Sequence, residues 1–116
     1  MRLADVEFRS RGHIVIAHIT GEVDLSNAGE LGTALIDAIA NDTWALVLEL
    51  SDVEHLDSAG IQLLYHLRAD LQARGQTLRL VIPPRSAAHD ALRLAGVSHH
   101  IQLADTVDDA LGELTI

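Results

Sequence analysis

The sequence predicts a single α/β domain, residues 1–116, with a mixed, mostly parallel sheet of about five strands, an N-terminal hairpin and about four helices. Short apolar runs rich in β-branched residues alternate with segments in which apolar residues recur every three or four positions. The links between these segments are short. Strand–helix–strand units with short links form parallel sheets with right-handed crossovers.

The N-terminal part of the chain predicts a β-hairpin and a helix. Val6 and Phe8 alternate with polar residues as in an edge strand, and residues 13–20 (HIVIAHIT) form a second strand after a turn. Residues 21–24 are expected to be a loop, followed by a helix from about 28 to 41. Two polar residues are good candidates for the N-cap of this helix, Asp24 and Ser26.

The middle of the chain predicts a strand, an acidic loop and a helix. Residues 44–48 (WALVL) are an apolar run of strand length, and residues 51–57 are expected to be the loop. From Ser58 to Gly75 apolar residues recur on one helical face, with Gln62, His66 and Asp70 in a polar row on another. Asp57 and Ser58 should therefore lie at the carboxyl end of a strand, where ligands and partners of α/β sheets bind.

The C-terminal part of the chain predicts two more strand–helix units. Residues 78–82 form a strand that Pro83-Pro84 ends, because proline cannot continue a ladder of hydrogen bonds. Ser86 should cap a short helix that stops at Gly96. A last short strand is expected over residues 100–103, and a final helix capped by Asp105 or Thr106.

The amino-acid composition excludes several classes of function. Hydrophobic residues make up 48% of the chain, as in a folded globular protein. The formal net charge of −9 argues against nucleic acid as a partner, because phosphate binding needs clustered Arg or Lys. All eight basic residues are Arg, which excludes Schiff-base lysine chemistry, and the lack of cysteine excludes disulfides and zinc–thiolate sites. Without a visible signal peptide or apolar membrane span, we expect a cytoplasmic protein with no direct membrane insertion.

Ser58 is the strongest candidate functional residue, with Asp57 before it and Ala59-Gly60 after it. The simpler interpretation is structural, because serine is a preferred helix N-cap. The functional interpretation is a phosphoacceptor, since free N–H groups and the helix dipole tolerate a phosphate at a helix start. The phosphate would add about −1.5 to −2 charges to a surface that already carries Asp52 and Glu54.

Enzymatic and metal sites have less support. His55, Asp57 and Ser58 are the residue types of a catalytic triad, but sequence neighbours rarely converge correctly and no Gly-x-Ser-x-Gly turn is present. A response-regulator receiver needs a lysine that this chain lacks. Adjacent histidines such as His99 and His100 seldom bind one metal ion. No glycine-rich phosphate loop is present, so we expect a binding protein rather than an enzyme, with no cofactor.

Residues 50–61 (LSDVEHLDSAGI) resemble the signature of STAS domains, specifically bacterial anti-sigma-factor antagonists. In that family Asp-Ser-small-Gly opens a helix, and the serine is the regulated phosphoacceptor. Residues 21–31, 76–81 and 92–97 are similar to other family segments, so the resemblance covers nearly the whole chain. It implies a STAS-like fold.

The resemblance also implies partner switching. The unphosphorylated antagonist binds an anti-sigma factor, often a serine kinase with a histidine-kinase-like ATPase fold, and frees the sigma factor. Phosphorylation of Ser58 ends binding, and a metal-dependent serine phosphatase restores it. Asp57 would orient Ser58, or be only a loop acid; Gly60 would allow the partner's active site to approach, or serve helix packing. The implied partner-binding residues are Asp24, Ser26, Asn27, Asp57, Ser58, Ala59 and Gly60.

Two positions depart from the antagonist pattern. Ala59 stands where Ser or Thr is frequent, and Gln62 stands where Gly is frequent. This combination resembles STAS proteins of chemotaxis-linked and lipid-transport assemblies. A second hypothesis is therefore a STAS subunit of a membrane-associated complex, such as a lipid ABC transporter, with Ser58 as a structural or contact residue. The sequence leaves the oligomeric state open.

Overall fold

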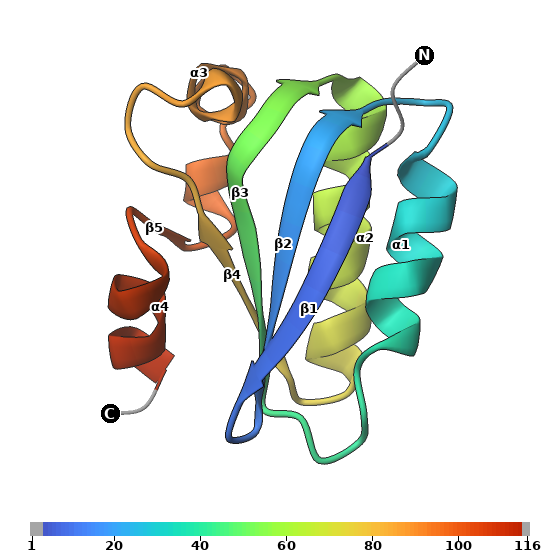
Figure 1. The fold of residues 1–116 in the computed structure, drawn as a ribbon, viewed down its shortest axis with the longest axis vertical. Coiled ribbons are helices and arrows are strands. Elements are labelled where there is room, and N and C mark those ends of the chain that lie inside the picture. The colour runs from blue at the N-terminus through green and yellow to red at the C-terminus, as the bar shows by residue number, and fades with distance from the viewer. Residues whose placement is uncertain (1–3, 115–116) are drawn as a thin grey trace.

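The structure, a computed structural model, describes residues 4–114 and contains a mixed five-stranded sheet with helices on both faces (Figure 1). The strands lie in chain order, β1 to β5. β1 and β2 are antiparallel and all other neighbours are parallel, as predicted. The strands are β1 (Asp5–Arg11), β2 (Ile14–Val23), β3 (Ala45–Leu56), β4 (Thr77–Val81) and β5 (Leu103–Ala104). The helices are α1 (Ala28–Asp37), α2 (Ser58–Ala73), α3 (Ala87–Leu94) and α4 (Val107–Leu114), with a 3-10 helix at Val97–His99.

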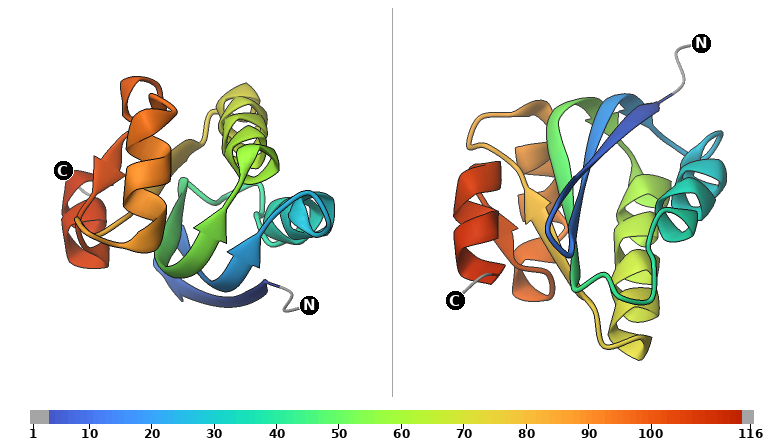
Figure 2. Two further views of the ribbon diagram at one scale, coloured as in Figure 1. Left: turned by 90° about the horizontal axis from the view of Figure 1, so that it is seen from above. Right: turned by 60° about the horizontal axis from the view of Figure 1, so that its bottom comes forward.

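The central strand β3 is buried on both faces, which explains its apolar run. α1, α2 and α3 pack over one face, and α4 covers part of the other (Figure 2). Ala45 and Val47 pack on the α4 side. Alternate residues point into the main core under the other three helices, and each is at most 1% exposed: Leu46, Leu48 and Leu50. Strands covered on both sides are apolar at successive positions instead of alternating.

β2 and β3 are longer than predicted. Residues 51–56, expected as an acidic loop, continue β3, and residues 21–23, expected as a loop, continue β2. The two strand ends pair with each other, Val23 opposite Leu56. Val23, Val53 and Leu56 are buried in the main core, while the acidic residues between them point to solvent. Burial of these apolar side chains outweighs the low strand propensity of the acidic ones.

The predicted helix caps are confirmed at α3 and α4 but wrong at α1. The Thr106 hydroxyl accepts a hydrogen bond from the N–H of Asp109 at 3.1 Å, as an N-cap does. Ser86 is the N-cap residue of α3, although its side chain makes no capping bond. α1 begins after Asn27 rather than after Asp24 or Ser26, and it ends at Asp37 rather than near residue 41.

Two further predictions at strand ends are corrected. The last strand lies at Leu103–Ala104 instead of residues 100–103, because residues 97–99 form a 3-10 turn. The central strand was predicted to begin at Trp44, but β3 begins at Ala45. Trp44 is 59% exposed, and its ring stacks on His13 with 4.7 Å between the ring centres.

Within residues 4–114, no helix combines the length and the apolar character that crossing a membrane requires.

Candidate functional site

Asp57, rather than Ser58, is the N-cap of α2. Its Oδ1 accepts hydrogen bonds from the N–H groups of Ala59 at 2.9 Å and Gly60 at 3.1 Å. These N–H groups have no partner inside the helix, so the carboxylate satisfies them. The other oxygen, Oδ2, accepts from the N–H of Leu25 at 3.3 Å. Asp57 thus joins the start of α2 to the loop between β2 and α1, which is more than a loop acid does.

Ser58 is the first residue of α2 and its side chain is exposed. The interpretation of Ser58 as a helix cap is wrong, because Asp57 makes both capping hydrogen bonds. The Ser58 hydroxyl makes no hydrogen bond to another residue of the described chain, 4–114. Its oxygen therefore faces solvent on the first turn of a helix, where a second molecule can reach it.

Residues 24–27 form a tight loop before α1, held by its own polar side chains. Asp24 Oδ1 accepts hydrogen bonds from the Ser26 hydroxyl and from the Ser26 N–H at 2.9 Å. The hydroxyl hydrogen bond is the main reason that the pKa of the Asp24 carboxyl lies below its ordinary value of 3.8, with burial acting against it and the charge of His55 adding to it. Asp24 is therefore ionised at neutral pH, and Ser26 is exposed beside it.

Asn27 supports this loop from inside. Its side chain is 5% exposed, its Oδ1 accepts from the N–H of Asp24 at 3.0 Å, and its Nδ2 donates to the carbonyl of Glu22 at 2.7 Å. A buried amide with these partners fixes the loop's shape. Asn27 therefore supports the loop through buried hydrogen bonds, and contact between this residue and a partner stays a prediction.

Gly60 faces the core rather than the solvent. A Cβ at this position would overlap the side chain of Leu56 and lie 3.2 Å from Cγ1 of Val23. The structure therefore supports the packing interpretation of Gly60: without a side chain, α2 can approach the ends of β2 and β3. The predicted role of Gly60 in letting a partner approach stays a prediction. Ala59, half-buried beside Ser58, remains at the surface.

An exposed apolar residue next to Ser58 is missing from the sequence prediction. Leu25 lies in the loop between β2 and α1 and is 84% exposed, and its backbone N–H donates a hydrogen bond to Asp57. The sequence does contain a hint, because a leucine stands inside a run of polar, loop-forming residues, Asp24 to Asn27. Exposed apolar side chains mark interaction surfaces when they form a contiguous patch with other apolar residues.

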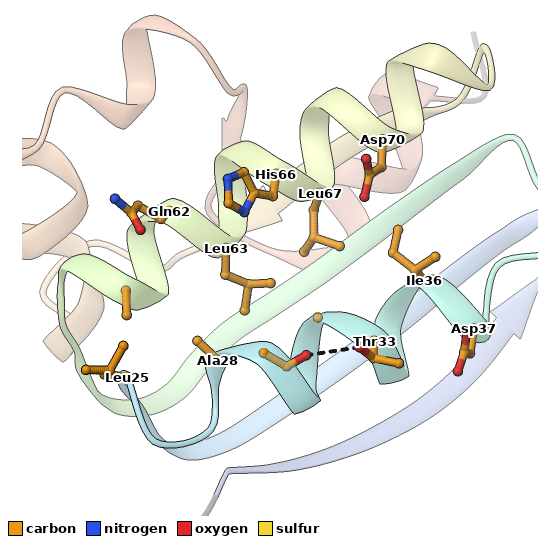
Figure 3. A pocket seen from close by; sticks show the side chains of 13 residues that line it. Leu25, Ala28, Thr33, Ile36, Asp37, Gln62, Leu63, His66, Leu67 and Asp70 are labelled. Carbon is orange, nitrogen blue, oxygen red and sulfur yellow. Dashed lines mark hydrogen bonds between the residues drawn. The ribbon is translucent and has the colours of Figure 1, made fainter.

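Leu25 also stands at one end of a groove of about 610 Å³ between α1 and α2 (Figure 3). The polar row predicted on α2 forms one wall of this groove, and the helices approach closely where Gly32 faces Leu63. A Cβ on Gly32 would lie 2.8 Å from Cδ1 of Leu63. The residues that line the groove near Ser58 are Leu25, Ala28, Ala59, Gln62 and Leu63.

The described residues do not show the geometry of a catalytic triad at His55, Asp57 and Ser58 or of a metal site at His99 and His100. Both oxygens of Asp57 accept backbone hydrogen bonds, and none of the hydrogen bonds between described residues joins Ser58 to His55. His100 lies edge-on to the ring of Tyr65, with 5.8 Å between ring centres. Among residues 4–114 no three His, Asp or Glu side chains gather as metal ligands.

Known proteins resemble this chain along most of its length. Residues 5–110 match the family model of the STAS domain. The anti-sigma-F factor antagonist RsfB of Mycobacterium tuberculosis is 32% identical over 99 residues, which are 84% of this chain and 79% of RsfB. The crystal structure of an anti-sigma factor antagonist from Mycobacterium paratuberculosis has a TM-score of 0.86 at 26% identity, covering 97% of this chain and 95% of that one.

The phosphorylated form of Bacillus SpoIIAA shares the fold, with a TM-score of 0.64 at 16% identity over 94% of this chain and 98% of SpoIIAA. Sequence and structure thus agree on one assignment: this chain belongs to the STAS domain family.

Proposed function

We propose that this protein is an anti-sigma factor antagonist whose binding is controlled by phosphorylation of Ser58. The unphosphorylated form binds an anti-sigma factor that is also a serine kinase with a histidine-kinase-like ATPase fold, and the sigma factor is released. Phosphorylation ends binding, and a serine phosphatase reverses it. One observation carries the proposal: Ser58 is exposed at the start of α2, and Asp57 has taken over the capping role.

The geometry suits phosphoryl transfer to Ser58. Its oxygen would form a bond to the γ-phosphorus of ATP held by the kinase, ADP would leave, and a base of the kinase would take the hydroxyl proton. Asp57 fixes the helix start through three backbone hydrogen bonds, so Ser58 is presented on a rigid element. The product phosphate would lie at the positive end of the α2 dipole, which tolerates an anion.

Charge and apolar contact explain why a phosphate would end binding. Leu25 is the exposed apolar residue beside the acceptor, and partners anchor on such residues when water is excluded around them. A phosphate of about −1.5 to −2 charges would have to be desolvated at that contact. It would also stand near the ionised carboxylate of Asp24, in a chain of net charge −9.

The relatives support this proposal. RsfB, 32% identical, is an anti-sigma-F factor antagonist, and SpoIIAA, with the same fold, exists in a phosphorylated form.

The test is phosphosite mapping by mass spectrometry, on protein from growing and from stressed cells of the native organism. We expect phosphate on Ser58 with an occupancy that changes between the two conditions, and none on Ser98, another exposed serine, in the 3-10 helix. A Ser58 that is unmodified in every condition would overturn the switch. It would favour a STAS subunit of a membrane-associated complex, the alternative that Ala59 and Gln62 suggest.

A further inference from the structure

The outer edge of β1 has no partner strand. β1 is the first strand of the sheet order, and only β2 pairs with it within residues 4–114 (Figure 1). Six of its seven residues are exposed, all except the half-buried Val6. An open edge presents unpaired N–H and C=O groups to any strand that can align with it.

The charges along β1 follow a definite order. Asp5, Glu7, Arg9 and Arg11 alternate with other residues, so all four point to the same face of the sheet. It is the face on which α4 packs, because Arg9 and Arg11 pair with Ile16 and Ile14 of β2. The acidic pair comes first and the basic pair second.

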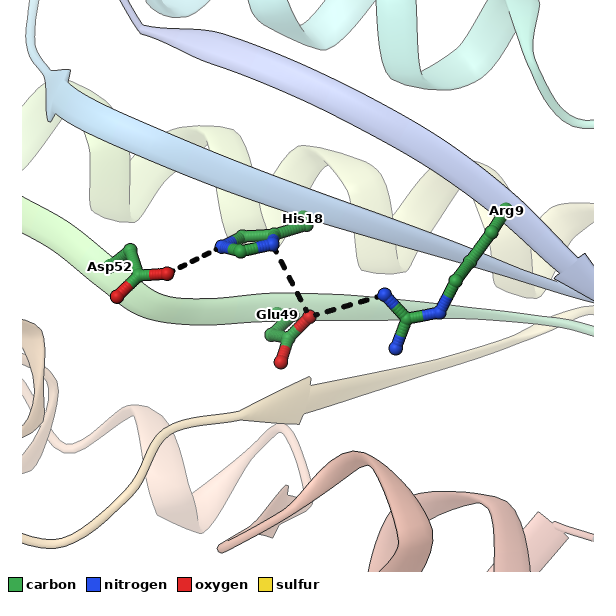
Figure 4. A network of polar contacts seen from close by, with 4 residues as sticks. All are labelled: Arg9, His18, Glu49 and Asp52. Carbon is green, nitrogen blue, oxygen red and sulfur yellow. Dashed lines mark hydrogen bonds and ion pairs between the residues drawn. The ribbon is translucent and has the colours of Figure 1, made fainter.

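The side chain of Arg9 lies along this face of the sheet, beside Glu49 of β3 (Figure 4). Its Nη1 lies 3.7 Å from Oε1 of Glu49, and Nδ1 of His18 lies 3.7 Å from the same oxygen. His18 Nε2 lies 2.7 Å from Oδ2 of Asp52. The side chain of Arg9 is still 54% exposed, so it can meet a further carboxylate.

The centre of β1 is an exposed aromatic residue. Phe8 points to the opposite face from the charges and is 43% exposed. Val6 and Ser10, two positions before and after Phe8, lie on the same face as its ring. Charges alone would protect an edge strand from pairing, but an exposed phenylalanine at its centre does not.

We infer that β1 pairs with β1 of a second copy of this chain, antiparallel, with Phe8 opposite Phe8. In this register Asp5 lies opposite Arg11 and Glu7 lies opposite Arg9, so each charge meets its opposite. Opposite charges on directly facing residues stabilise strand pairs, and like charges destabilise them. Sliding one strand by two residues places Glu7 opposite Glu7 or Arg9 opposite Arg9. The charge order therefore selects one register, and the two sheets join into one.

Charge reversal tests this interface. Sedimentation equilibrium over a concentration series should show a dimer for the natural chain. Asp5→Arg/Glu7→Arg makes the strand wholly basic, and Arg9→Glu/Arg11→Glu makes it wholly acidic, so each should raise the dimer dissociation constant by about tenfold or more. An equimolar mixture of the two variants should recover dimers. Asp70→Arg/Asp90→Arg, on exposed positions of α2 and α3, is the control and should dimerise like the natural chain.

An engineered cysteine tests the register, and the absence of natural cysteine makes the result clear. Facing Cα atoms of antiparallel strands are about 4.5–5.5 Å apart, within disulfide range. Phe8→Cys should therefore crosslink to itself, and Leu94→Cys, 79% exposed on α3, should not. A natural chain that stays monomeric at all concentrations would overturn the inference, and so would a dimer that is insensitive to both charge reversals. Either result leaves the role of Ser58 untouched.

Discussion

Asp57 caps helix α2, and this leaves the hydroxyl of the neighbouring Ser58 without a capping role. Both residue types are preferred helix caps, so their adjacency in the sequence leaves the cap undecided. The structure decides it: the backbone of Asp57 is extended, with φ −93° and ψ −171°, and the helical conformation begins at Ser58. A serine one residue past the cap has no helical N–H to bond and can serve a partner.

Stability measurements should separate the two residues. Asp57→Ala removes the cap of α2, so the free energy of unfolding should fall by about 0.5–2 kcal/mol. Ser58→Ala should change it by less than about 0.5 kcal/mol, as for most exposed positions. Urea denaturation measures both, with Asp70→Ala, an exposed position near the C-terminal end of α2, as the control. If Ser58→Ala were as costly as Asp57→Ala, Ser58 would be the cap after all.

The Asp24 carboxyl should titrate below 3.8, because the Ser26 hydroxyl donates to it. A depressed pKa favours the folded loop above the unfolded-state pKa, and that contribution is lost as pH falls through the folded-state pKa. The loop contact should therefore be intact at neutral pH and weaken only in acid. A carbon-detected NMR titration measures the midpoint, and Ser26→Ala should raise it. An unchanged midpoint in that variant would refute the assigned cause.

Leu25 should matter for binding and not for folding. Leu25→Ala should weaken binding to the anti-sigma factor by about tenfold, as for an anchor residue, because its side chain is 84% exposed in the free protein. The midpoint of thermal unfolding should not change. Leu94→Ala, at 79% exposure on α3, is the matched control and should bind normally. Calorimetric titration would contradict the anchor role if the two variants bound equally well.

At the scale of elements, α2 depends on a glycine for its close contact with β2 and β3. Gly60→Ala should lower the free energy of unfolding by about 1–3 kcal/mol, as an extra methyl in a packed core does, because its Cβ meets Leu56 and Val23. Gly29→Ala in α1 should instead raise it by up to about 1 kcal/mol, since nothing lies within 4 Å of its Cβ. Equal effects at both positions would show that helix propensity alone is responsible.

The order and type of the elements could be predicted from the sequence, because apolar periodicity reports directly on buried faces. Strand ends could not be predicted. Residues 51–56 carry charges that favour a loop, and only pairing with β2 places them in β3. The groove between α1 and α2 could not be predicted either, because it depends on the contact between Gly32 and Leu63, which lie far apart in the chain.

The candidate site, too, could be predicted only in part, because some of its features depend on contacts between residues far apart in the chain. The motif around Ser58 was visible, and the structure keeps Asp24, Ser26, Ser58 and Ala59 at or near the surface. It places Asn27 and Gly60 inside, where they support the loop and the helix packing. Sequence patterns identify residue types that suit a binding site, whereas burial depends on neighbours from other elements.

At the scale of the whole molecule, the proposed switch needs no change of fold. The acceptor oxygen is already exposed, and the loop and helix beside it are held by hydrogen bonds between β2, α1 and α2. A phosphate can therefore act directly on the contact surface, by charge and desolvation. The open β1 edge is a separate surface of the sheet and binds independently of the switch.

The most direct test of the account compares partner affinity for the natural chain, Ser58→Ala and Ser58→Glu, by calorimetric titration with the anti-sigma factor kinase of the same organism. Like charges placed at an interface cost several kcal/mol, so Ser58→Glu should lose binding by about a hundredfold or more. Ser58→Ala should bind like the natural chain, and so should Ser98→Glu, the matched control. Equal affinities for Ser58→Ala and Ser58→Glu would contradict the proposed switch.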